Sequence, residues 1–157
     1  ADSALAMPVV MACMSMAQSA SIDMLMYYDA RPRVAYNGLF DHYTQAPMPQ
    51  YYALYAWKNL VRLGTQVRSE VSDDDIYVVS AKGEDGTVGI LVTYFTNDKN
   101  VVGDKVVELD VRDMDIKESV SHVTDKHLRY TEIPVEFVDG KTTLWLSPNS
   151  VTYIELN

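Results

Sequence analysis

The sequence has few of the residues that build metal centres or covalent cross-links. It contains one cysteine and three histidines in 157 residues, which excludes an intramolecular disulfide, and the histidines have no acidic or histidine partner at a known metal-ligand spacing. It also shows no Gly-rich phosphate loop, no HExxH pattern and no Ser-His-Asp arrangement. We therefore predict no metal site and no cofactor, and we expect Cys13 to be an inert thiol buried in an apolar helix.

Basic residues are also scarce. Thirteen Lys and Arg stand against 22 Asp and Glu, which gives a formal net charge of −9. This charge disfavours nucleic acid and anionic membranes as partners, because affinity for phosphate comes largely from clustered Lys and Arg. The apolar stretch from Leu5 to Ala20 follows Asp2, has no flanking Lys or Arg, and is interrupted by serine and glutamine. It predicts a buried helix and not a signal peptide or a membrane span.

The residues that are present indicate a folded protein with two unlike halves. Apolar residues make up 48% of the chain and charged residues 22%, which is the globular range, but 157 residues are too few for a complete (β/α)₈ barrel of about 250. Residues 1–69 carry a net charge of +1 and residues 70–157 one of −10, and seven of the eight methionines precede residue 50. We predict two domains, 1–69 and 70–157, with a boundary at about 66–72.

The first domain has a helix–strand–helix pattern. Good helix formers predict a helix over about 6–20, and the nearly continuous apolar run 22–28 predicts a strand buried on both faces. A long loop over about 29–46 follows, of a length that is often functional. A second helix over 51–63 begins after two prolines and ends before Gly64. We expect the methionines of the first helix to fill the core, together with the aromatic residues of the second, Tyr51, Tyr52, Tyr55 and Trp57.

The second domain has the pattern of an antiparallel β-sandwich. Asp85-Gly86 and Asp139-Gly140 lie between apolar runs and predict hairpins, because glycine takes the positive φ of a type I′ turn without steric cost. The triplet Asp73 to Asp75 is expected to be a solvated turn and not a cation site. Predicted strands span 76–81, 87–96, 104–111, 119–124, 128–138, 141–147 and 150–156. Aromatic side chains expected to be buried among apolar neighbours are Tyr77, Tyr94, Tyr130, Trp145 and Tyr153. The chain is thus α+β by content, mainly an antiparallel β-sandwich preceded by an α/β segment.

Several strings of residues carry a family resemblance. The strings 24–32 (MLMYYDARP), 36–41 (YNGLFD) and 51–57 (YYALYAW) resemble the end of a clan A glycoside hydrolase barrel, nearest to the β-xylosidase and arabinofuranosidase-like members related to family thirty-nine. The strings 89–97 (GILVTYFTN) and 146–155 (LSPNSVTYIE) are similar to the central and closing strands of the accessory sandwich in such enzymes. The resemblance covers essentially the whole chain.

This resemblance implies that the chain is a C-terminal fragment of a glycosidase. It would contain the seventh helix, eighth strand and eighth helix of a TIM barrel, followed by the sandwich. The resemblance also places five residues at the active-site rim of the barrel, where their rings and polar groups would bind the glycoside substrate in the intact parent: Tyr28, Asp29, Arg31, Tyr36 and Asn37. The alternative is that Asp29 and Arg31 form a loop salt bridge while the tyrosines fill the barrel mouth.

The catalytic pair of the family has no counterpart in the barrel-like part of this chain. Retaining enzymes of this clan use two glutamates, whose carboxyl groups lie about 5 Å apart. All seven glutamates of the chain lie beyond residue 69. The resemblance therefore assigns no catalytic residue to this chain. We expect the chain alone to hydrolyse nothing, although the resemblance implies that the parent is a retaining glycosidase.

Two interpretations of function stay open at the level of sequence. In the first, the chain closes the barrel, supplies rim residues and braces the barrel with a structural sandwich, so that its partners are the rest of the barrel and a glycoside. In the second, it is a non-catalytic carbohydrate-binding β-sandwich module or a protein-interaction domain. We also expect self-association through residues 1–30, because an apolar strand without its barrel neighbours has two open edges.

Overall fold

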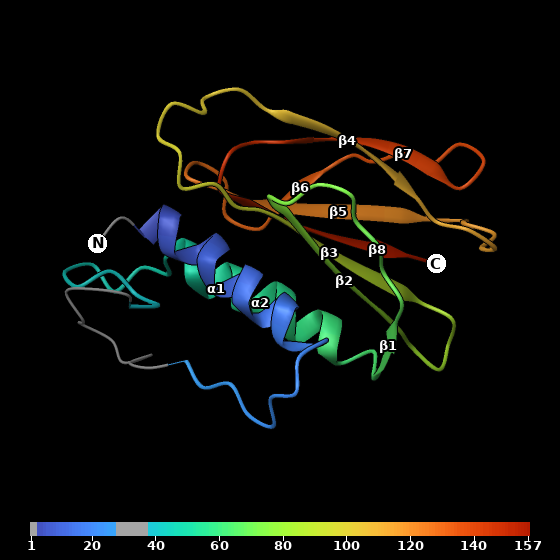
Figure 1. Ribbon diagram of the computed structural model, residues 1–157, viewed down its shortest axis with the longest axis horizontal. Helices are drawn as coiled ribbons and strands as arrows, with labels where there is room; N and C mark the ends of the chain where they lie inside the picture. Colours follow the sequence, from blue (N-terminus) through green and yellow to red (C-terminus); the bar gives the residue numbers. More distant parts are fainter. Residues whose placement is uncertain (1–2, 28–37) are drawn as a thin grey trace.

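The fold has three layers, which Figure 1 shows from one side. The computed structural model describes residues 3–27 and 38–157. Two helices cover one face of a six-stranded antiparallel sheet, and a two-stranded antiparallel ribbon covers the other face. The elements are α1 (Ser3–Ala17), α2 (Pro49–Val61), β1 (Thr65–Val67), β2 (Ile76–Lys82), β3 (Val88–Tyr94), β4 (Lys105–Asp110), β5 (Ser119–Thr124), β6 (Thr131–Ile133), β7 (Lys141–Leu146) and β8 (Ser150–Leu156).

Both predicted helices are confirmed, with bounds shifted toward the N-terminus. Helix α1 ends at Ala17 because the Gln18 and Ser19 side chains donate hydrogen bonds to the carbonyls of Met14 and Met16, 3.2 Å each, which satisfies the last turn. Helix α2 has Pro49 as its first residue, where the missing N–H has no helical partner to lose. The chain leaves α2 through Gly64, whose φ of +94° lies in the left-handed region.

The sheet has the strand order β1-β2-β3-β8-β5-β6, and every pairing in it is antiparallel. The antiparallel, sandwich-like arrangement is therefore confirmed. The predicted strand 128–138 shrinks to the three residues of β6, because Tyr130 has a φ of +51° and Pro134, directly after the strand, has no N–H to pair. The short strand β1 was not predicted, and its pairing with β2 falls at the predicted domain boundary. That boundary stays a prediction.

The ribbon of β4 and β7 covers the sheet through alternate side chains. Leu144 and Leu146 are buried against Ile90, Ile154 and Leu156 of the sheet. The turn that leads into β7 has the predicted type I′ geometry: Asp139 and Gly140 have φ of +50° and +75°, and Val138 and Lys141 exchange backbone hydrogen bonds of 2.9 and 3.0 Å. The Asp85-Gly86 hairpin is confirmed as well, but with a longer turn in which only Gly86 is left-handed.

The helical layer packs on the opposite face with small residues next to the sheet. Ala53, Ala56 and Leu60 of α2 and Met7 and Met11 of α1 form one buried cluster with Leu91, Val151 and Tyr153 of the sheet. The expected core role of the methionines holds for Met7 and Met11. The aromatic residues of α2 are less buried than expected, because alanines occupy its sheet-facing positions and leave Tyr51, Tyr52 and Trp57 half-buried and Tyr55 exposed.

The predicted strand 22–28 is wrong over its described part. Residues 22–27 form no strand, and the side chains of Met24 and Met26 are 73% and 79% exposed. A strand needs a hydrogen-bonding neighbour, and residues 22–27 pair with neither edge strand of the described sheet, β1 or β6. Within the described residues, neither helix has the length and apolar character needed to cross a membrane.

Candidate functional site

The five predicted rim residues lie outside the part of the chain that the structure describes. Tyr28, Asp29, Arg31, Tyr36 and Asn37 all fall within residues 28–37. Their roles in substrate binding therefore stay predictions.

Residues 38–48 connect these positions to α2. The Asp41 carboxylate accepts hydrogen bonds from the Tyr43 and Thr44 backbone N–H groups, at 3.0 and 2.7 Å, and from the Thr44 hydroxyl at 2.8 Å. These hydrogen bonds, that of the Thr44 backbone first, lower the pKa of Asp41. Phe40 pairs with Pro47 and packs against the ring of Tyr51, with the ring centres 5.4 Å apart. Asp41 thus closes a turn and has a structural role.

The outer side of the helical layer exposes many apolar side chains. Helix α1 contains no charged residue, and Leu5, Val9 and Met16 on it are exposed. The expectation that Cys13 is buried is wrong, because it lies on this exposed side. We define the uncovered apolar surface as Leu5, Val9, Met16, Ile22, Met24, Leu25 and Met26.

Aromatic residues join α2 to the β5–β6 edge of the sheet. The Asn59 amide donates a hydrogen bond of 3.0 Å to the Tyr130 hydroxyl, and the rings of Tyr130 and His122 stack with centres 4.2 Å apart. On β8, the buried Tyr153 hydroxyl donates to the Glu155 carboxylate at 2.9 Å. Burial, together with this hydrogen bond, raises the pKa of Tyr153. In residues 3–27 and 38–157, no three His, Cys, Asp or Glu side chains gather closely enough to hold a metal ion.

The acidic triplet binds a cation from its own chain. Lys105 at the start of β4 donates to Asp73 at 2.8 Å and to Asp75 at 3.1 Å, and its ammonium lies 4.9 Å from the centre of the Tyr94 ring. The Lys105 hydrogen bond lowers the pKa of Asp73. The predicted turn is present, and the Asp73 and Asp75 side chains are 38% and 50% exposed. Through Lys105, these two carboxylates also fasten the ribbon to the start of β2.

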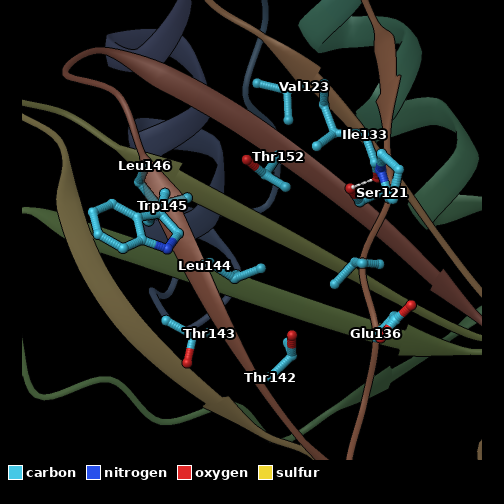
Figure 2. A pocket seen from close by; sticks show the side chains of 12 residues that line it. Ser121, Val123, Ile133, Glu136, Thr142, Thr143, Leu144, Trp145, Leu146 and Thr152 are labelled. Atoms are coloured by element: carbon cyan, nitrogen blue, oxygen red, sulfur yellow. Dashed lines mark hydrogen bonds between the residues drawn. The ribbon is translucent and has the colours of Figure 1, made fainter.

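A small pocket opens between the ribbon and the sheet, next to β5 and β6. Its volume is about 190 Å³, and β7, β8, β5 and the segment after β6 line it. Trp145 lines this pocket although its side chain is 71% exposed, so the expectation that Trp145 is buried is wrong. In the view of Figure 2, Thr142, Thr143 and Glu136 lie at the bottom, Val123 and Ile133 at the top, and Trp145 at the left. The expected burial is confirmed for Tyr94 and Tyr153, while Tyr77 and Tyr130 are half-buried.

Solved glycoside hydrolases share this fold. A glucosidase from Croceicoccus marinus matches 100% of this chain with a TM-score of 0.71 and 14% identity, over 43% of its own length. A family 30 subfamily 8 xylanase from Clostridium acetobutylicum matches 77% of this chain with a TM-score of 0.63 and 17% identity, over 31% of its length. A family 51 arabinofuranosidase from Xanthomonas axonopodis pv. citri matches 77% with a TM-score of 0.52 and 13% identity, over 29% of its length.

These comparisons concern the fold. The chain spans less than half the length of each of the three enzymes. No protein-family model and no curated protein matches the sequence.

Proposed function

We propose that this chain is the C-terminal part of a retaining glycoside hydrolase of clan A, related to the β-xylosidase and arabinofuranosidase-like enzymes. Residues 1–69 would close the barrel, with Tyr28, Asp29, Arg31, Tyr36 and Asn37 at the active-site rim, and residues 70–157 would form the accessory sandwich. The names of the similar enzymes, a glucosidase, a xylanase and an arabinofuranosidase, favour a neutral glycoside as the substrate of the parent. The two catalytic glutamates would come from the part that precedes this chain.

The likeness to the glucosidase carries this proposal, because it includes the helices as well as the sheet. The whole of this chain matches, and more than half of that enzyme has no counterpart here. Folds host many activities, so a shared fold by itself leaves the chemistry open. The strings that resemble the end of a barrel lie within residues 24–57, ahead of the predicted sandwich. The match to the glucosidase includes this part of the chain as well as the sandwich.

The uncovered apolar surface supports the proposal that another protein surface covers it in the parent. A helix that is apolar on all sides is normally buried on all sides, yet Val9 and Met16 of α1 are exposed. Exposed apolar surface of this kind marks a contact with another protein surface. In the parent the rest of the barrel would cover it, and in the isolated chain a second copy would.

The first test is hydrolysis by the purified chain. With p-nitrophenyl xyloside, arabinofuranoside and glucoside as substrates, we expect no turnover above a buffer blank, because the family's catalytic pair is missing. The in-frame coding sequence upstream of Ala1 should encode the remaining strand–helix repeats and two glutamates at strand ends. Turnover that persists through repurification, or an upstream frame without such repeats, would contradict the proposal.

The second test is the oligomeric state of the chain. Light scattering over a concentration series should show a dimer or a larger species, and Met26→Lys should shift it toward the monomer. Tyr43→Lys is the matched control, because Tyr43 is 88% exposed but lies outside the uncovered apolar surface. A monomeric wild-type chain at all concentrations would show that this surface does not drive association.

A further inference from the structure

The Trp145 side chain stands out on the sandwich because its neighbours on the same strand are buried. Leu144 and Leu146 are 7% and 1% exposed, whereas Trp145 between them is 71% exposed. Side chains of a strand alternate between its two faces, so the same alternation that buries the leucines holds the indole outside. From this position and the pocket beside it, we infer that the sandwich carries its own binding site for a neutral oligosaccharide, with Trp145 as the stacking platform.

The lining of the pocket has the chemistry that such a ligand needs. Thr142 and Glu136 offer a hydroxyl and a carboxylate at one end of the pocket (Figure 2), and Thr143 adds a hydroxyl on the outer face of β7 that also carries Trp145. Sugar hydroxyls both donate and accept, so threonine hydroxyls and a carboxylate can fix their directions. The flat face of an indole covers the C–H face of a pyranose ring, as amphipathic aromatic rings do at other interfaces. The pocket therefore combines an apolar wall with polar groups at its end, which suits an amphipathic ring.

Charge decides between a neutral sugar and an acidic one. None of the twelve lining residues is a Lys or an Arg, and Glu136 is the one charged group among them. The cation of the same strand, Lys141, is engaged by Glu108 at 2.9 Å and by Asp110 at 3.8 Å. Phosphate and carboxylate ligands are normally held by cationic groups. Uronic acids and phosphosugars are therefore disfavoured here.

Size restricts the occupant further. Pockets for drug-sized ligands have about 300–1,000 Å³, and this one has about 190 Å³. A single sugar ring of a longer chain can enter it while the next ring rests on Trp145. The site is independent of the proposed barrel contact, because every residue that lines the pocket lies between Ser121 and Thr152.

The test uses the full chain and two neutral probes, xylohexaose and cellohexaose. Titration is followed by ¹⁵N–¹H correlation spectra, with the Trp145 indole N–H assigned by its loss in Trp145→Phe. We expect saturable shifts of that signal and of the Thr142 and Thr143 amides with at least one probe. Trp145→Ala should weaken binding at least tenfold, and Glu136→Gln should weaken it severalfold. Hexagalacturonate, the anionic probe, should cause no saturable shift.

Matched controls separate ligand binding from other effects. Tyr43→Ala removes an exposed aromatic ring remote from the pocket lining and should bind like the wild type. Because Trp145 is exposed, Trp145→Ala should keep its thermal midpoint and its dispersed spectrum. Failure of both neutral probes to bind, or unchanged binding by Trp145→Ala, would overturn the inference. So would light scattering in which Trp145→Ala abolishes self-association without any sugar binding, since Trp145 would then be a protein contact.

Discussion

The two layers that cover the sheet differ most on their outer sides. The outer side of the ribbon carries charges that pair with one another, as Lys141 does with Glu108 and Asp110. The outer side of α1 carries none, and exposes Val9 and Met16 instead. Both layers bury a fully apolar cluster against the sheet. Their inner sides are thus alike. On its outer side the ribbon combines paired charges with the exposed Trp145, whereas α1 presents an apolar surface without any charge.

This difference shows that burial within one chain does not explain the composition of α1. A helix that covers only one face of a sheet needs an apolar stripe of limited width. The helix has apolar residues on its exposed side as well, and Met24 and Met26, which follow it along the chain, are exposed too. The ribbon has the narrow stripe that its single contact requires, because Leu144 and Leu146 face inward while Thr143 and Trp145 face outward.

The largest expected effects come from the two buried clusters. Met11→Ala in the helical layer and Ile154→Ala beneath the ribbon each remove a fully buried side chain, and each should lower the free energy of unfolding by about 2–5 kcal/mol. If residues 70–157 fold as their own unit, Met11→Ala should leave the amides of β3 and β8 protected from hydrogen exchange, whereas Ile154→Ala should weaken protection there. Equal loss of protection in both variants would contradict the predicted domain boundary.

A smaller effect is expected at the turn that enters the ribbon. A Cβ atom at Gly140 would lie 2.5 Å from the Val111 carbonyl oxygen, and Gly140 has a φ of +75°. Gly86 has a similar φ of +94°, but nothing lies within 4 Å of its Cβ position. In both Gly→Ala variants the left-handed backbone should lower the free energy of unfolding by about 1–2 kcal/mol. The loss should be larger for Gly140→Ala because its Cβ atom would contact the Val111 carbonyl oxygen. Urea denaturation measures both, and equal losses would show that Val111 yields freely.

The smallest effects are expected from pH, and they differ between the two faces. Lys105 lowers the pKa of Asp73 from 3.8. The stability that Asp73 contributes to the fold is therefore present above about pH 4 and is lost as the pH falls through the lowered pKa. Burial raises the pKa of Tyr153 from 10.0. The stability that Tyr153 contributes to the fold is therefore present below pH 10 and is lost as the pH rises through the raised pKa.

Two variants test whether Asp73 and Tyr153 cause the loss of stability on the acid and the alkaline side of the pH profile. Lys105→Met should flatten the acid side of a plot of thermal midpoint against pH, and Tyr153→Phe should flatten the alkaline side. Each should leave the other side unchanged, because the two groups lie on opposite faces of the sheet. A change of both sides by one variant would indicate that the faces are coupled.

Local patterns in the sequence were sufficient for most of the secondary structure. The alternation of Leu144 and Leu146, the apolar run of β3 and the Asp139-Gly140 turn are signals within a few residues, and the structure confirms each. The same alternation already places Trp145 on the outer face. Its apolar character favoured burial instead, and the period-two pattern was the stronger guide.

Other features depend on neighbours that a local pattern does not contain. The pairing of Lys105 with Asp73 joins residues 32 apart in sequence, so nothing in the acidic triplet indicates its partner. The run 22–28 has the composition of a buried strand, yet a strand forms only where another strand offers a hydrogen-bonding edge. The pocket likewise combines β5, β7 and β8, which are brought together by the sheet order alone.

The sheet order has a consequence for the sequence of events in folding. Strand β8 follows every other strand along the chain, yet it lies at the centre of the sheet, between β3 and β5. Until β8 has left the ribosome, β3 and β5 have no shared neighbour, and the apolar faces of the half-sheets remain open. Nascent chains that stall before residue 150 should therefore bind chaperones readily. Once the seven residues of β8 have been added, both buried clusters can close at once.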